Sequence, residues 1–313
     1  MISTCATAAA KLILFGEHAV VYDQPAIAIP LLDVRASAAI SIDLSSATPV
    51  IEAKDLRMTL PITEARQPSL QHIVNAIELF EARAMPLPAT GWRLTVWSKI
   101  PFSRGLGSSA AISIAILRAL SASQKIHFSS EQFIELSFEL EKFHHGTPSG
   151  LDNTVIAVER PIIFRKGQPP QNIEPKSFTF VVGDTGVGKK TSDVVSFVAA
   201  NYHSNPGHAG KIFSEIGAIA LAGRECLEQG KLKKLGELMT KNQDLLSELE
   251  VSSPELDTLI GAAKNAGALG AKLCGAGKGG CMVALTEDTK SAETVSRALL
   301  QAGALKTFIT RLK

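Results

Sequence analysis

The sequence has few cysteines, little net charge and no long uninterrupted apolar run. Only four of its 313 residues are cysteines, and their spacing forms neither a disulfide framework nor a metal knuckle. We therefore expect free thiols and a cytoplasmic protein. The formal net charge of +2 is too small to predict a nucleic acid or a membrane surface as the partner. No apolar run reaches the ~20 residues that span a bilayer, and the start of the chain does not fit a secretory signal.

Hydrophobic residues make up 45% of the chain, which is enough to fill the cores of a globular protein. Strand-like and helix-like segments alternate, which favours a mixed α and β architecture. Expected strands are 12–15, 36–42, 92–97, 162–164, 178–182 and 282–285. Expected helices are 69–84, 108–123, 130–144, 208–229, 231–249 and 254–266.

A glycine-rich loop precedes an alanine-rich apolar run. The segment Pro101–Ala111 reads Pro-Phe-Ser-Arg-Gly-Leu-Gly-Ser-Ser-Ala-Ala. Gly105 and Gly107 let the backbone approach a ligand and adopt positive φ, and Ser108 and Ser109 suit a helix N-terminus. Because free N–H groups at a helix N-terminus attract anions, the segment predicts a phosphate-binding loop. An ordinary capped turn explains these residues equally well.

Two further segments have the same character. Lys272–Leu285 places four glycines before an apolar strand, and Ala10–Tyr22 is a strand-like run that ends abruptly in Gly-Glu-His. The second pattern puts charged groups at the end of a strand. Three such segments in one chain favour phosphate binding over a simple turn.

Together and in this order, the three segments resemble the three motifs of the GHMP kinases (galacto-, homoserine, mevalonate and phosphomevalonate kinases). The resemblance implies a two-domain α+β fold, with a ribosomal-protein-S5-domain-2-like N-terminal domain and a ferredoxin-like α/β sandwich at the C-terminus. It also implies a left-handed βαβ unit, where the general rule predicts a right-handed one. The proline-rich, polar stretch Arg165–Ser177 suits an interdomain segment, so we expect domains at 1–177 and 178–313.

Within this family, Gly16–Tyr22 and His145–Asn153 are similar to segments of the mevalonate kinases. Bacterial phosphomevalonate kinases usually have tyrosine where this chain has His18. The chain departs from the family where Ser103 and Arg104 replace the small residues that usually precede Gly-Leu-Gly. Arg104 lies next to the phosphate loop, where it can alter the binding of a nucleotide or a regulator.

The resemblance implies ATP as the phosphate donor, Mg²⁺ as the cofactor and mevalonate as the small-molecule acceptor. The expected nucleotide-binding residues are Pro101, Gly105, Leu106, Gly107, Ser108, Ser109, Ala110, Gly275, Gly277 and Gly279. The expected acceptor-binding residues are Glu17, His18, Lys189, Lys190 and Thr191. The expected Mg²⁺ ligands are Glu141 and a hydroxyl of Ser108 or Ser109, between which the sequence does not decide.

Two residues are candidates for the chemistry. Asp152 follows a turn-prone Pro-Ser-Gly and by itself reads as a turn residue, while Lys11 by itself reads as a strand-end lysine that reaches solvent. The resemblance makes Asp152 the proton acceptor. It makes Lys11 the cation that keeps Asp152 ionised and draws the acceptor oxygen toward phosphorus.

A competing phosphate loop is present at Gly183–Lys190, which nearly matches G-x-x-x-x-G-K-[ST]. A P-loop needs a hydroxyl for Mg²⁺ at its last position, and this chain has Lys190 there. A P-loop NTPase is therefore disfavoured. A similar segment lies by the acceptor in mevalonate kinases, which makes Lys189, Lys190 and Thr191 candidates for holding a carboxylate.

We therefore expect a kinase that transfers phosphate from ATP to the 5-hydroxyl of mevalonate in isoprenoid synthesis. One alternative is a sibling GHMP kinase acting on phosphomevalonate or homoserine. Another, from a different class, is a noncatalytic ligand-binding protein on the same fold. A homodimer stays open.

Overall fold

Strands β1 (Ser3–Phe15) and β2 (Ala26–Ile42) each run through both of the units into which the chain folds. The structure is a computed structural model and describes residues 3–145 and 149–313. The first unit contains the chain up to Ala10 together with 31–101 and 107–159. The second contains 11–30, 102–106 and 160–313.

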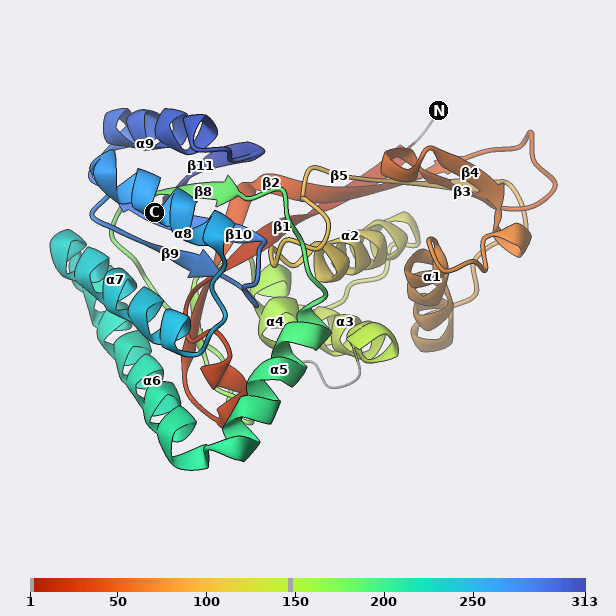
Figure 1. Ribbon diagram of the computed structural model, residues 1–313. Helices are drawn as coiled ribbons and strands as arrows, with labels where there is room; N and C mark the ends of the chain where they lie inside the picture. The colour runs from red at the N-terminus through yellow and green to blue at the C-terminus, as the bar shows by residue number, and fades with distance from the viewer. Residues whose placement is uncertain (1–2, 146–148) are drawn as a thin grey trace. The chain divides into compact units, whose positions relative to one another are not determined.

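The first unit combines one sheet with four helices (Figure 1). β2 pairs antiparallel with β5 (Trp92–Ser98), β5 pairs parallel with β3 (Val50–Ala53), and β3 pairs antiparallel with β4 (Met58–Pro61). The helices are α1 (Gln71–Arg83), α2 (Ser108–Ser123), α3 (Ser130–His145) and α4 (Leu151–Val158). Because α1 lies between the parallel strands β3 and β5 in the chain, these elements form the βαβ unit.

Helix α2 is the centre of this unit's core. Its residues from Ala110 to Leu120 are buried except Arg118, which is partly exposed. A helix that is apolar on nearly all sides must be enclosed by other elements, and α2 contacts α1, α3, α4 and β5. The packing fixes the direction of the helix whose N-terminus follows the glycine-rich loop.

The second unit has a four-stranded antiparallel sheet in the order β11-β8-β10-β9. These strands are Lys306–Leu312, Phe178–Asp184, Cys281–Thr286 and Gly270–Cys274. Helices α7 (Leu232–Glu248), α8 (Pro254–Asn265) and α9 (Thr289–Gln301) pack on the sheet (Figure 1). Helices α5 (Thr191–Ser204) and α6 (Pro206–Gln229) pack on each other, and β6 (Ile162–Phe164) joins the first residues of β2 to β7 (Gln171–Asn172).

The expected α+β class is confirmed, and every expected strand and helix is present. Elements that the sequence did not predict are β3, β4, β7, β9, β11, α4, α5 and α9. The stretch Arg165–Ser177, expected between domains, lies within the second unit and includes β7. The domain boundary at 177/178 stays a prediction.

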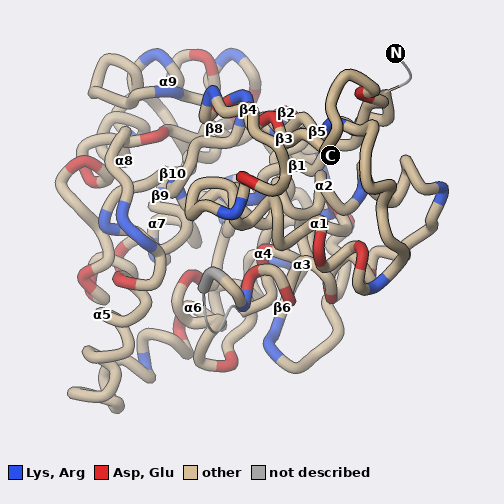
Figure 2. Tube along the Cα trace, turned by 90° about the vertical axis from the view of Figure 1, so that its right-hand side faces the viewer, with Lys and Arg blue, Asp and Glu red and all other residues tan. Residues whose placement is uncertain are grey.

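Charge and polarity agree with the composition. Basic and acidic residues are interspersed along the Cα trace (Figure 2). Within the described parts of the chain, none of the helices combines the length and the apolar character that a bilayer crossing requires. All four cysteines are free thiols, as expected.

Candidate active site

The glycine-rich loop has the backbone that a phosphate loop requires. Gly105 and Gly107 have φ of 77° and 73°, and α2 begins at the next residue, Ser108. The Ser108 hydroxyl is buried and has no hydrogen-bond partner. Since the first N–H groups of a helix have no intrahelical acceptor, the start of α2 offers several donors to an anion. Pro101, Leu106, Ser109 and Ala110 complete the predicted segment in the same stretch of chain.

A hydroxyl and a carboxylate meet at the start of the same helix. Ser109 Oγ donates a hydrogen bond to Glu141 Oε1 on α3, and Glu141 is only 9% exposed. Mg²⁺ binds one or two protein oxygens together with phosphate and water. These two oxygens, with Ser108 Oγ nearby in sequence, fit that ion. Among the described residues, no cluster of three or more His, Cys, Asp or Glu could hold a metal ion instead.

Asp152 lies in the first turn of α4. The helix begins directly after Gly150, whose φ of 85° marks the turn into it. Gly146 to Pro148, which belong to the predicted motif, lie outside the described residues. The other chemical candidate, Lys11, is on β1 and is only 2% exposed. Its backbone N–H donates to the carbonyl of Leu106, 3.1 Å away, so β1 lies directly beside the glycine-rich loop.

Glu17 and His18 are both buried after the end of β1. Glu17 forms a fully buried ion pair with Lys272 on β9, while its Oε2 has no hydrogen-bond partner. Burial raises the pKa of Glu17, and the Lys272 ammonium opposes this shift only in part. His18 Nε2 lies 2.8 Å from the carbonyl of Ala276, and burial lowers the pKa of His18. The Gly-Glu-His turn is therefore attached to the third glycine-rich segment.

The third segment contains glycines at which an added side chain would contact neighbouring backbone atoms too closely. A Cβ on Gly277 would lie 2.1 Å from the Val251 carbonyl oxygen, and one on Gly279 would lie 2.8 Å from that of Val187. Gly275, with φ of 82°, would place a Cβ 3.1 Å from the Cα of Gly105. Two of the predicted phosphate segments thus approach each other backbone to backbone.

The Gly183–Lys190 loop connects β8 to α5, which begins at Thr191. Lys189, Lys190 and Thr191 are exposed. A narrow pocket brings this loop together with the two glycine-rich segments. Its lining residues are Ser103, Arg104, Gly105, Lys189, Thr191, Cys274, Ala276, Gly277, Gly279 and Gly280.

Comparison with known proteins identifies the family. Residues 71–160 match the family "GHMP kinases N terminal domain", and residues 224–305 match "GHMP kinases C terminal". The chain is 35% identical to a mevalonate kinase of Thermococcus onnurineus over 95% of this chain and 93% of the relative. It is 34% identical to one of Pyrococcus abyssi over 98% of this chain and 95% of the relative. The chain is a GHMP kinase.

Solved structures agree with this assignment. A Methanococcus jannaschii mevalonate kinase superposes with a TM-score of 0.87 at 26% identity, covering 100% of this chain and 99% of the other. The L. major mevalonate kinase in complex with R-mevalonate gives a TM-score of 0.85 at 26% identity, covering 100% and 96%. The GHMP kinase fold expected from the three motifs is thereby confirmed.

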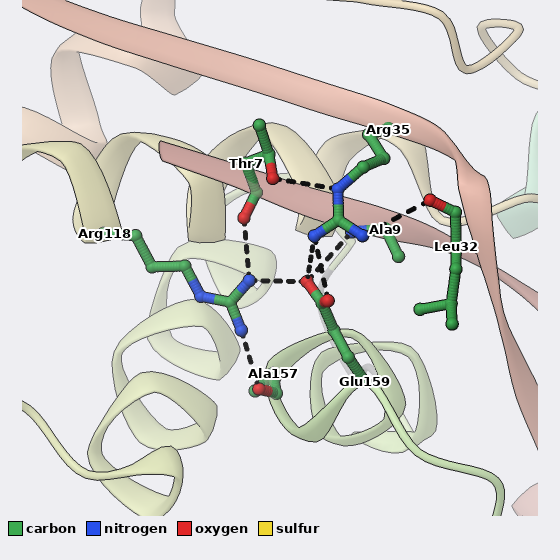
Figure 3. A network of polar contacts seen from close by, with 7 residues as sticks. All are labelled: Thr7, Ala9, Leu32, Arg35, Arg118, Ala157 and Glu159. Carbon is green, nitrogen blue, oxygen red and sulfur yellow. Dashed lines mark hydrogen bonds and ion pairs between the residues drawn. The ribbon is translucent and has the colours of Figure 1, made fainter. Parts of the chain in front are cut away.

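Within the first unit, the carboxylate of Glu159 joins β1 and β2 to the helices α2 and α4, and these helices carry candidate residues of this GHMP kinase (Figure 3). Glu159 follows α4 and accepts from Arg35 on β2 at 2.7 and 2.8 Å and from Arg118 on α2 at 2.6 Å. The Ala9 N–H on β1 also donates to it, at 3.2 Å. Arg118 in turn donates to the carbonyl of Thr7 at 2.8 Å. The ends of α4 and α2 are therefore fixed to β1 and β2.

Two groups of predicted residues come together within a unit. In the first unit these are Ser109 and Glu141. In the second unit, Lys11 and Leu106 meet through a backbone hydrogen bond, and His18 contacts the carbonyl of Ala276. The pocket brings together five further predicted residues, Gly105, Lys189, Thr191, Gly277 and Gly279. Sequence reasoning missed Lys272, because nothing in a strand sequence marks a lysine that pairs with a residue 255 positions away. It noted Arg104 without finding its partner.

Proposed function

We propose that this GHMP kinase is a mevalonate kinase, which transfers the γ-phosphate of ATP to the 5-hydroxyl of mevalonate in isoprenoid synthesis. The observation that carries the proposal is the match, over nearly the whole chain, to archaeal proteins named mevalonate kinase. The buried Gly-Glu-His turn supports it, since His18 stands where phosphomevalonate kinases usually have tyrosine. A cytoplasmic location belongs to the same proposal, and the homodimer stays a prediction.

Phosphoryl transfer requires alignment, charge neutralisation and a place for the acceptor proton, and little covalent chemistry. We assign the proton to the carboxylate of Asp152, at the start of α4. We assign to Lys11 the task of keeping that carboxylate ionised and polarising the acceptor oxygen. The burial of Lys11 supports this role, because a cation is more effective where water is scarce.

The nucleotide would be held by backbone amides more than by side chains. The first N–H groups of α2 and the loop at Gly105 and Gly107 suit its phosphates, with Gly275, Gly277 and Gly279 leaving space for close approach. Ser108 or Ser109 and Glu141 would hold Mg²⁺, which neutralises phosphate charge when bound. The buried, unpartnered Ser108 hydroxyl supports such a ligand at this point.

The acceptor would be recognised by buried polar groups and by exposed lysines. Glu17 Oε2 can accept a hydrogen bond, and the neutral imidazole of His18 can exchange one with a hydroxyl or a carboxylate. Lys189, Lys190 and Thr191 supply cations and a hydroxyl for a small carboxylate. Mevalonate carries both kinds of group.

An acceptor screen tests the proposal. Purified protein, ATP and Mg²⁺ should convert mevalonate to a product heavier by one phosphate, with one ADP formed per product. Faster turnover of phosphomevalonate or homoserine would show that mevalonate is not the preferred acceptor, while the assignment to the GHMP kinases would stand. Nucleotide binding without turnover of any acceptor would favour a noncatalytic ligand-binding protein.

Asp152→Asn tests the chemical role. The substitution keeps the size of the side chain and removes the proton acceptor, so kcat should fall by ~10²–10⁴. Nucleotide affinity, measured by titration, should change little because the loop amides hold the phosphates. Glu141→Gln is the matched control, since its defect should be relieved in part by raised Mg²⁺. An Asp152→Asn enzyme with nearly full kcat would exclude Asp152 as the base.

A further inference from the structure

The side chain of Arg104 connects two loops that are 80 residues apart in the sequence. Arg104 lies in the glycine-rich loop, and its Nε is 2.9 Å from Oδ1 of Asp184 at the end of β8. Its Nη2 donates to the carbonyl of Gly186 at 2.7 Å. The same Asp184 oxygen accepts from the Gly186 N–H at 2.9 Å. One guanidinium therefore binds both the carboxylate and the backbone of the β8–α5 loop.

The β8–α5 loop leaves space for that guanidinium only because Gly188 has no side chain. A Cβ at Gly188 would lie 2.1 Å from Arg104 Nη1 and 2.9 Å from the carbonyl oxygen of Ser103. The Arg104 side chain is 17% exposed and its Asp184 partner 3% exposed, so the pair is largely removed from water. Because charges shielded from water are screened less than exposed ones, Arg104 holds Asp184 more firmly than a surface ion pair would.

The third glycine-rich segment joins the same cluster. Gly280 donates its N–H to the Val187 carbonyl at 2.7 Å, and its carbonyl accepts from Thr185 Oγ1 at 2.7 Å. A Cβ on Gly280 would lie 3.1 Å from the Arg104 carbonyl oxygen. Residues from all three segments line one pocket, with Gly105 from the glycine-rich loop and Lys189 and Thr191 from the end of the β8–α5 loop and the start of α5.

We propose that Arg104 is a positioning residue that couples the nucleotide loop to the acceptor loop, so that occupation of one orders the other. A ligand that fixes residues 103–107 holds Arg104 in place, and through Asp184 and Gly186 it holds the β8–α5 loop. By linkage, an acceptor bound at Lys189 and Thr191 must then favour the nucleotide by the same factor. This inference rests on the proposed function for the identity of the two ligands.

Hydrogen exchange tests the coupling without any acceptor. The probe is the non-hydrolysable analogue adenylyl-imidodiphosphate with Mg²⁺, added at saturation to the wild type, Arg104→Ala and Arg104→Lys. In the wild type the analogue should slow exchange at 103–110 and also at 184–191. In Arg104→Ala, protection at 103–110 should persist while protection at 184–191 is lost, and Arg104→Lys should lie between, since an ammonium cannot bridge both partners.

The matched control is Arg165→Ala. Arg165 is exposed and also donates from Nε to a backbone carbonyl, that of Asp23, at 2.7 Å, but it is not part of the pocket wall. Its substitution should leave both protected regions unchanged. Equal protection of 184–191 in Arg104→Ala and the wild type, or none there in the wild type, overturns the coupling. Absence of protection at 103–110 in the wild type overturns the proposed function and the coupling with it.

Calorimetric titration gives the reciprocal readout. Mevalonate should raise the affinity of the wild type for the analogue by a factor on the order of 5 or more, within the usual range of such couplings. The factor should fall to about one in Arg104→Ala, whatever the Kd of each ligand alone, because the factor is a ratio of two affinities of the same variant. Asp184→Asn combined with Arg104→Ala should add no further loss. A factor of one in the wild type, or an unchanged factor in Arg104→Ala, contradicts the proposal.

Discussion

Two glutamates, a half-buried one in the first unit and a fully buried one in the second, show how the number of donors decides what a shielded carboxylate does. Glu159 accepts hydrogen bonds from two arginines and a backbone N–H. Although burial raises its pKa, the hydrogen bonds from Arg35 and Arg118 outweigh this, and the pKa of Glu159 is lowered. Glu17 forms an ion pair with Lys272 and keeps an oxygen without a hydrogen-bond partner, and burial raises the pKa of Glu17.

The difference separates a structural charge from one that can still bind a ligand. The donors to Glu159 lie on β1, β2 and α2, so these hydrogen bonds stabilise the arrangement of those elements with α4. Glu17 is held in place by Lys272, yet it retains an acceptor that the protein does not satisfy. A buried polar atom without a partner in an otherwise well-paired structure points to a ligand. This agrees with the predicted role of Glu17 at the acceptor.

The largest effect should come from removing the lysine that forms the ion pair with Glu17. Lys272→Met leaves the buried carboxylate without its ion-pair partner, and breaking a buried pair in this way costs about 3–5 kcal/mol of unfolding free energy. Denaturant titration measures it. Lys264→Met, at an exposed lysine, is the matched control and should change little. The double variant Lys272→Met with Glu17→Gln should recover much of the loss, and additive losses would contradict the pairing.

A smaller loss is expected when one charged acceptor is removed from the other network. Glu159→Gln keeps the shape but weakens the charged hydrogen bonds with Arg35 and Arg118, each of which contributes about 1.5–3 kcal/mol. Arg35 and Arg118 keep other partners, at Thr7 and Ala157. We therefore expect the unfolding free energy to fall by about 1.5–3 kcal/mol in total. Unfolding of Arg93→Met, which loses the ion pair between Arg93 and Asp43, provides the comparison. A loss no larger than that of Arg93→Met would mean that the Glu159 network stabilises the fold no more than one ordinary ion pair does.

The lowered pKa of Glu159 also predicts a pH dependence. A carboxyl whose pKa is lower in the folded state stabilises the fold above its ordinary value of 4.5, and this stabilisation is lost as the pH falls through the folded pKa. The difference in unfolding free energy between the wild type and Glu159→Gln should therefore be constant near pH 7 and shrink below pH 4.5. A difference that grows as the pH falls would mean that the pKa of Glu159 is raised in the folded state, which would contradict the prediction.

The smallest effect concerns the backbone at Glu159, whose φ is +50°. Both Glu159→Ala and Glu159→Gly remove the carboxylate, but only glycine adopts this conformation without the cost of about 1–2 kcal/mol that other residues meet. The glycine variant should therefore be more stable than the alanine variant by about 1 kcal/mol. Thermal unfolding of the two proteins measures the difference, and equal stabilities would show that the backbone at this position carries no strain.

Local patterns in the sequence predicted the elements that carry strong local signals. Helix α2 was predicted at its observed bounds because glycines precede it and apolar residues fill it. Helix α4 was missed because Asn153, Thr154 and Val155 are weak helix formers, and burial of the helix overrides that preference. The part of β1 before Leu12 was missed because alanines are uncommon in strands, yet β1 pairs with β2 and Ala8, Ala9 and Ala10 are buried.

For the candidate site, the motifs located the loops but not the links between them. Glycines and serines at Pro101–Ala111 are a local signal, since they describe one turn and one helix start. The partners of Glu17 and Arg104 lie 255 and 80 residues away, and which strand pairs with which decides them. A side chain such as Lys272 has no local mark that distinguishes it from a solvent-exposed lysine.

The division of β1 and β2 between the two units has a consequence for synthesis of the chain. Residues 11–30 belong to a unit whose remaining parts begin mainly at Arg160. At about 5–20 residues per second, ribosomes need on the order of ten seconds to make the intervening chain. During that time β1 and β2 have each other as partners, but β6, which pairs with Ala26–Ala28, has not been made. The nascent chain thus exposes apolar residues of β1 and β2 that become buried only when the second unit folds.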